Sequence, residues 1–274
     1  MENPCNQIYY FYIYSIRIHN NFEYLYRHVT NIRPIHNMKF NILNDIKDLF
    51  FPPTCPVCGR VMSEGARTIC NSCRIEAPLT GFWKQFDNPV VRKFWGIIPV
   101  VNASSFMFFV HGNGFRNLIH DFKYAGHWKL ALDIGRWYGG ELARSGLYND
   151  IDVVIPIPLH YRRRLKRGYN QSEYIAHGIS KALGVPLDTR SVCRHKYNQS
   201  QTRQNVHERW DNVRGIFSVR RPERLYGKHI LLVDDVLTTG STLISCAETI
   251  LKSVPDVRIS IATLAVSRSH IEEV

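Results

Sequence analysis

The chain has 274 residues, a length that accommodates one full-sized domain with a small accessory module and excludes a disulfide-stapled mini-protein. Hydrophobic residues make up 45% and charged residues 21%, which excludes wholesale disorder and a fibrous repeat. A formal charge of +12 favours polyanions, phosphorylated small molecules or an acidic membrane face as partners. The best apolar stretch, residues 97–110, is too short and too polar to cross a membrane, so we expect no membrane insertion.

The first 37 residues differ in composition from the rest, because they hold eight of the thirty-three aromatic residues and no lysine. Met38 then opens a predicted helix whose apolar residues repeat at helical spacing until Pro52. We interpret 1–37 as an atypical extension, either untranslated, with Met38 as the true start, or real but poorly ordered. We predict a lead helix and cysteine module over 38–82 and the main domain over 95–268.

Four of the seven cysteines form two C-x-x-C pairs, Cys55/Cys58 and Cys70/Cys73. An odd cysteine count without a signal peptide is typical of a reducing compartment, where close pairs more often hold metal than form disulfides. Each pair predicts a tight turn with both sulfurs on one side, and Gly59 allows the turn behind the first. The spacing predicts a structural Zn²⁺ ribbon. The alternative, a pair of thioredoxin-like redox motifs, lacks the βαβ pattern that should follow.

Beyond this module, predicted strands and helices alternate. Strands are expected near 97–110, 151–157, 214–219, 229–233 and 257–265. Helices are expected near 114–125, 128–145, 171–183 and 241–252. The runs Val153–Ile155 and Ile230–Val233 are wholly apolar, as in strands buried on both faces, and each leads into a loop and a helix. The pattern predicts an α/β fold with a parallel sheet flanked by helices.

A basic segment, Tyr161–Arg167, follows the proline-rich turn that begins at Pro156. Its five basic residues are Arg162, Arg163, Arg164, Lys166 and Arg167. The wider stretch 151–228 contains sixteen Lys and Arg against six Asp and Glu, so the positive charge is local. Such a segment indicates a surface that faces phosphate groups, a nucleic acid or only solvent.

The stretch Ile230–Thr242 combines an apolar strand, two adjacent carboxylates and a hydroxyl-rich loop that leads into a helix. Gly240 lets backbone amides turn inward, and with the helix N-terminus and the hydroxyls they form a cradle for a phosphate. Asp234 and Asp235 are placed to accept hydrogen bonds from a vicinal diol. A sugar with a phosphate and cis-hydroxyls satisfies both halves; the alternative is a Thr-rich turn that caps a helix.

This stretch resembles the ribose-phosphate signature of type I phosphoribosyltransferases, whose substrate is phosphoribosyl pyrophosphate (PRPP) with Mg²⁺. The resemblance implies that Asp234 and Asp235 hold the ribose 2′ and 3′ hydroxyls, with Asp235 the acidic candidate nearest the reacting carbon. It also implies that the 5′-phosphate is wrapped by Thr238, Thr239, Gly240, Ser241 and Thr242. Hypoxanthine-guanine members carry a third Asp at the position of Thr238, so a 6-oxopurine acceptor is disfavoured.

Further motifs narrow the resemblance to a family. They are Phe122-Lys-Tyr124-x-Gly126, Pro156-x-Pro158-Leu159-His160, Arg167-Gly-Tyr-Asn-Gln171, Gln201-Thr-Arg-Gln204 and the stretch Arg209–Phe217. With the four-cysteine ribbon, they resemble the ComF (competence protein F) family over about residues 40–268. The resemblance implies a cytoplasmic bacterial protein that is linked to uptake of transforming DNA and acts with a competence helicase.

Two functions fit these residues. The first is an enzyme that displaces pyrophosphate from PRPP with an unidentified nitrogen nucleophile, and in which Mg²⁺ and positioning matter more than a strong base. Its pyrophosphate would lie against the loop residues Pro158, Leu159, His160 and Arg167, with the other basic residues as further candidates. The second is a PRPP-sensing module in which Arg162, Arg163, Arg164 and Lys166 bind single-stranded DNA. Tyr161, Tyr169 and Trp210 are candidates to stack on bases, although Trp210 also fits a core position.

Overall fold

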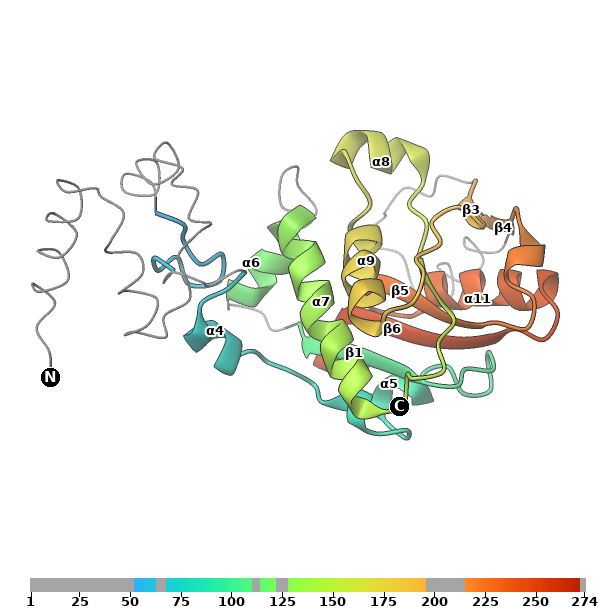
Figure 1. The fold of residues 1–274 in the computed structure, drawn as a ribbon, viewed down its shortest axis with the longest axis horizontal. Helices are drawn as coiled ribbons and strands as arrows, with labels where there is room; N and C mark the ends of the chain where they lie inside the picture. The colour runs from blue at the N-terminus through green and yellow to red at the C-terminus, as the bar shows by residue number, and fades with distance from the viewer. Residues whose placement is uncertain (1–51, 63–67, 110–113, 122–127, 196–214, 272–274) are drawn as a thin grey trace, which may run out of the picture. The chain divides into compact units, whose positions relative to one another are not determined.

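The computed structural model describes residues 52–62, 68–109, 114–121, 128–195 and 215–271 (Figure 1). All of them belong to one unit that spans 52–274. The interpretations placed on 1–37, the lead helix, the motifs at 122–126 and 201–204, and Trp210 lie outside the described residues, and the domain division remains a prediction. Within the described part, no helix combines the length and apolar character that a membrane crossing requires.

A parallel four-stranded sheet with the order β1-β6-β5-β2 forms the centre of the fold. Its strands are β1 (Ala103–Phe108), β2 (Val153–Pro156), β5 (His229–Leu237) and β6 (Arg258–Val266). The central strand β5 alternates between two cores: Leu231 and Val233 lie in one buried cluster, and Ile230 and Leu232 lie in the other. Both faces are therefore covered, as the apolar runs predict.

Helices form a layer on each side of this sheet (Figure 1). They are α7 (Trp128–Ser145), α9 (Gln171–Leu183), α11 (Ser241–Ser253) and the short α5 (Pro89–Arg92). Residues of α7 and α9 share one core cluster with Leu231, whereas residues of α5 and α11 share the other with Leu232. The predicted α/β fold with a parallel sheet flanked by helices is confirmed.

Helices α7 and α9 cross at close range because glycines line their contact. A Cβ on Gly135 would lie 2.3 Å from the carbonyl oxygen of Ile175, and a Cβ on Gly178 would lie 2.2 Å from that of Leu132. No side chain fits there without moving a backbone. The crossing fixes the position of α9, whose first residues lie at the carboxyl end of β5.

The remaining elements are short. They are α4 (Asn71–Ile75), α6 (Gly114–Asp121), α8 (Tyr161–Arg167), the antiparallel pair β3 (Val192–Arg194) and β4 (Phe217–Val219), and 3₁₀ turns at Phe82–Lys84, Pro222–Arg224 and Arg268–His270. Helix α8 begins where the His160 ring accepts a hydrogen bond from the backbone N–H of Arg162 at 3.3 Å, and it ends at Gly168 with a φ of +80°.

Two strand predictions differ from the structure. We expected a strand near 229–233, but β5 continues through both acidic residues to Leu237, because β6 pairs with it as far as Val266. The strand expected near 97–110 is limited to Ala103–Phe108. Pairing with a neighbouring strand sets these ends, and local composition does not report it.

Candidate functional site

The two carboxylates lie beyond the end of β2, at the carboxyl edge of the sheet. Pro156, the last residue of β2, pairs with Val233, and the Ile157 N–H donates to the Val233 carbonyl at 2.8 Å. Asp234 and Asp235 follow directly, and both are half-buried. They lie past the end of β2 and within the last residues of β5, at the edge of the sheet where open α/β sheets bind ligands.

Two donors hold one oxygen of Asp234. The Ser172 hydroxyl donates to Oδ1 at 2.9 Å, and the backbone N–H of Asp235 donates to the same atom at 2.9 Å. Burial and the adjacent Asp235 charge raise the pKa of Asp234 to about 7, although both hydrogen bonds and the Arg194 charge oppose the rise. Asp235 Oδ1 accepts from the Val236 N–H at 2.7 Å. Among the described residues, no donor reaches Oδ2 of either carboxylate.

The hydroxyl-rich loop turns at Gly240 into α11. Gly240 has a φ of +78°, a left-handed conformation that a side chain strains, and a Cβ there would lie 3.4 Å from the Phe94 ring. The Thr239 and Ser241 hydroxyl oxygens are 3.1 Å apart. The N-cap residue of α11, Gly240, has no side chain with which to cap the helix, and the first N–H group, that of Ser241, donates to the Thr239 hydroxyl at the long distance of 3.5 Å. Uncapped N–H groups beside hydroxyls can hold an anion.

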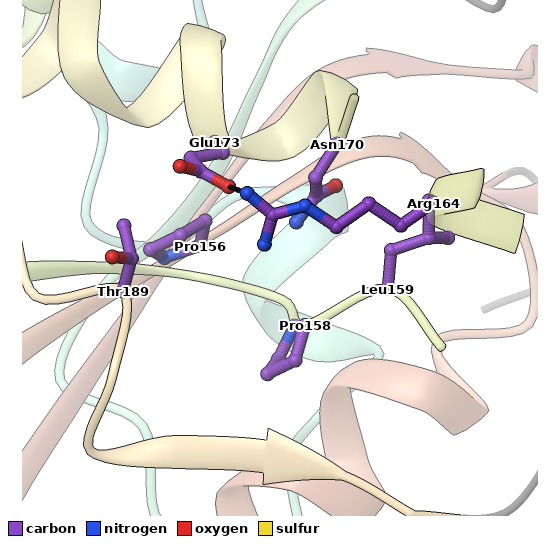
Figure 2. A pocket seen from close by; sticks show the side chains of 7 residues that line it. All are labelled: Pro156, Pro158, Leu159, Arg164, Asn170, Glu173 and Thr189. Atoms are coloured by element: carbon purple, nitrogen blue, oxygen red, sulfur yellow. Dashed lines mark ion pairs between the residues drawn. The ribbon is translucent and has the colours of Figure 1, made fainter. Parts of the chain in front are cut away.

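The turn after β2 lines a small cavity of about 50 Å³ (Figure 2). Its lining residues are Pro156, Pro158, Leu159, Arg164, Asn170, Glu173 and Thr189. Figure 2 shows Arg164 reaching across this cavity to Glu173, with 3.6 Å between Nη2 and Oε2. The structure thus brings Pro158, Leu159 and Arg164 together, while His160 is buried with its Nε2 at 3.1 Å from the carbonyl oxygen of His195.

The basic residues of α8 do not form one uniform surface. Arg164 pairs with Glu173, and Arg167 donates from Nη1 to Gln171 Oε1 at 3.1 Å, so both reach toward α9. Arg162 donates from Nε to the Tyr161 hydroxyl at 3.1 Å. The Tyr161 side chain is 58% exposed. The side chain of Lys166 lies outside the described ones.

The four predicted zinc ligands form a cluster in which all sulfurs lie within 4.8 Å of one another. Tetrahedral zinc with Zn–S bonds of about 2.3 Å places sulfurs about 3.8 Å apart, and Cys58 and Cys70 Sγ are 3.7 Å apart. Arg60 donates to Cys58 Sγ at 3.4 Å and lowers the pKa of Cys58 to about 6, which favours the thiolate that a metal needs. The residues therefore fit a closed structural zinc site without room for water.

Comparisons with known proteins support both the cysteine module and the domain that contains the parallel sheet. Residues 170–274 match the phosphoribosyl transferase domain family, and residues 46–82 match the double zinc ribbon domain family. Competence protein F of Haemophilus influenzae is 37% identical over 94 residues, 34% of this chain and 41% of that protein. Competence protein ComFC of Bacillus subtilis is 25% identical over 213 residues, 77% of this chain and 76% of that protein. The chain is therefore similar to competence proteins F and ComFC, and it matches both a phosphoribosyl transferase domain and a zinc ribbon domain.

Other similar proteins match more partially. DNA utilization protein YhgH of Shigella flexneri is 30% identical over 139 residues. The match covers 50% of this chain and 60% of that protein. Among solved structures, adenine phosphoribosyltransferase from Saccharomyces cerevisiae has a TM-score of 0.31 at 15% identity, over 53% of this chain and 71% of that one. The fold class of this chain rests on its sheet order and on the two domain matches.

Sequence reasoning missed two residues of this site, Ser172 and Arg194. Burial lowers the pKa of Arg194, as does the nearby Arg163, while the Asp234 charge opposes the change. The Arg194 Nε is buried and has no hydrogen-bond partner within the described residues. Ser172 directly follows the Arg167–Gln171 motif, a signal that could have identified it. Arg194 lies in a three-residue strand and offered no such signal.

Proposed function

We propose that this protein is a member of the competence protein F family, that it binds PRPP with Mg²⁺ at the carboxyl edge of its sheet, and that it acts in the cytoplasm, in DNA uptake with a competence helicase. One observation is the main support for this ligand. Two half-buried carboxylates at the end of β5 are followed directly by a left-handed glycine turn that leads into α11. The phosphoribosyl transferase domain match supports it. The names of the competence and DNA utilization relatives support the cellular role.

In this proposal, each part of PRPP meets a different segment. Oδ2 of Asp234 and Asp235 accept the ribose hydroxyls, and Thr238–Thr242 surround the 5′-phosphate. Pro158, Leu159, His160 and Arg167 are assigned to the pyrophosphate. The only metal-suited cluster of three or more His, Cys, Asp or Glu among the described residues is the cysteine one, so we assign Mg²⁺ to the oxygens of PRPP itself. Bound there, Mg²⁺ would neutralise the departing pyrophosphate.

The proposed reaction forms a bond between an acceptor nitrogen and the anomeric carbon and breaks the bond to pyrophosphate, which leaves with the electron pair. Asp235 is the proposed catalytic residue, because its carboxylate can stabilise positive charge on the ribose and accept the proton that the acceptor loses. In this proposal, the rest of the rate acceleration comes from exclusion of water and from alignment of the two reactants.

Calorimetric titration with Mg-PRPP tests the assignment. The variant Asp234→Asn/Asp235→Asn should bind at least about tenfold more weakly, because each carboxylate accepts a charge-assisted hydrogen bond. The control Asp133→Asn/Glu141→Gln makes the same charge change on α7, where both acids pair with arginines of their own helix. Equal affinity in all three proteins would reject the site.

A second candidate function is a PRPP-sensing module that binds single-stranded DNA without catalysis. It is favoured by the exposed Tyr161 ring at the start of a helix in which five of seven residues are basic. Such a surface can stack a base and neutralise neighbouring phosphates. Release of pyrophosphate from PRPP in a pool of cellular metabolites distinguishes the two functions, since only the enzyme produces it.

A further inference from the structure

The Arg167–Gln171 motif has a structural position that the proposed ligand contacts do not explain. Its last residues, together with Ser172, begin α9 between the turn after β2 and the acidic end of β5. Asn170, Gln171 and Ser172 are 6%, 2% and 4% exposed, so three consecutive polar side chains are buried. Buried polar side chains need specific partners, and the partners of this segment identify its role.

Asn170 occupies the N-cap position of α9, yet its side chain does not cap the helix. At an N-cap, Asn ordinarily accepts a hydrogen bond from its own first turn. Here its Nδ2 donates at 3.1 Å to the carbonyl oxygen of Ile157. The side chain therefore fixes the turn that carries Pro158 and Leu159 and leaves its own helix without a side-chain cap.

Ser172 makes the corresponding contact with the other half of the site. Its hydroxyl donates to Oδ1 of Asp234, 62 residues away in the chain. Because the Asp235 N–H donates to the same oxygen, both donors fix the carboxylate plane and leave Oδ2 for a ligand.

We propose that Asn170 and Ser172 are positioning residues, which hold the turn after β2 and the Asp234 carboxylate at one fixed separation from the start of α9. The inference rests on the proposed PRPP site and extends it, since it states how the pyrophosphate and ribose halves stay in register. Helix α9 can serve as the reference because its glycine-lined crossing with α7 prevents it from sliding. The adjacent Gln171 holds Arg167 in the same way.

The decisive experiment follows the Asp234 carboxyl directly in ligand-free protein, by ¹³C NMR titration with the signal assigned through Asp234→Asn. The Ser172 hydroxyl stabilises the charged carboxylate, so Ser172→Ala should move the titration midpoint of Asp234 to higher pH. Ser172→Thr keeps a hydroxyl and should keep the wild-type midpoint. The matched control is Ser180→Ala, which removes another buried hydroxyl of α9, one that donates to the Val185 carbonyl at 2.6 Å.

An unchanged midpoint in Ser172→Ala, or the same shift in Ser180→Ala, overturns the role of Ser172. If Ser172→Ala does not fold, a shifted midpoint in Ser172→Thr overturns it instead. The Mg-PRPP affinity at pH 7 should fall about tenfold in both Ser172→Ala and Asn170→Ala, while only the former moves the Asp234 titration. If Ser172→Ala shifts the Asp234 midpoint but the wild type does not bind Mg-PRPP, the positioning of Asp234 is supported and the proposed ligand is rejected.

Discussion

The cysteine cluster and the acidic pair of β5 both bring like-charged groups close together, but they differ in what compensates the charge. The four sulfurs surround the position of one zinc ion, with Arg60 as a further donor, and form a closed shell. Within the part of the chain that the structure describes, Asp234 and Asp235 accept hydrogen bonds on Oδ1 only, and the pKa of Asp234 is raised. A closed shell contributes to stability, whereas an open one keeps acceptors for a ligand. Perturbing the first should therefore change folding, and perturbing the second should change binding.

Metal removal should have the largest effect. Cys55, Ile69 and Cys73 share one buried cluster with Phe115 and Tyr138 of the main domain, so loss of the ribbon opens that core. Chelation of zinc, or Cys73→Ser, should destabilise the protein by several kcal/mol and lower the thermal midpoint seen by circular dichroism. Cys193→Ser changes a cysteine outside the cluster and should leave the midpoint in place. A melting curve that ignores the chelator would contradict the structural zinc.

Gly240→Ala should separate stability from binding. Its left-handed φ strains any side chain, by about 1–2 kcal/mol, while the distance of 3.4 Å to the Phe94 ring is an ordinary contact. Gly227 has a φ of +64°, and a Cβ there would meet nothing within 4 Å, so Gly227→Ala carries similar strain away from the loop. Both variants should lose similar stability in thermal melts, but only Gly240→Ala should lose Mg-PRPP affinity in calorimetry, by about tenfold or more. Equal Mg-PRPP affinities in the two variants would mean that the Gly240 loop does not contact the ligand.

The raised pKa of Asp234 predicts a pH dependence of stability. The folded state holds this proton more tightly than the unfolded state, so the carboxyl destabilises the fold progressively as pH rises from about 4 to about 7. Asp234→Asn removes this charge and should raise the thermal midpoint at pH 8, with the gain shrinking toward pH 5. A gain that is constant with pH would mean that the carboxyl titrates normally.

The smallest expected effect concerns the basic helix α8. Arg162→Gln/Arg163→Gln should lower the slope of log affinity against log salt for single-stranded DNA by about 1.4, at about 0.7 per phosphate contact. The stability should change little, because these residues lie on a short surface helix. The control Arg136→Gln/Arg144→Gln removes two exposed arginines of α7. An equal change of slope in the control would mean that the effect comes from the net charge of the protein and not from contacts made by α8.

The features that were predictable from the sequence are those encoded within one continuous segment of the chain. Helices α7 and α9 have the predicted bounds because their apolar periodicity is long. Helix α8 has only seven residues, begins at an unusual His160 cap and was not predicted. The cysteine cluster and the acidic pair with its loop are contiguous motifs, so they were visible. The contact of Ser172 with Asp234 depends on the packing of α9 against the sheet, which no local pattern reports.

Ligand-induced thermal stabilisation by Mg-PRPP, compared between the wild type and Asp234→Asn/Asp235→Asn, tests the central distinction most directly. A ligand that binds only the folded state raises its melting midpoint with concentration. The wild type should show this rise, and the variant should show none while melting at or above the ligand-free wild type. The same rise in both proteins, or no rise in the wild type, would contradict the assignment of the acidic pair as an open ligand site.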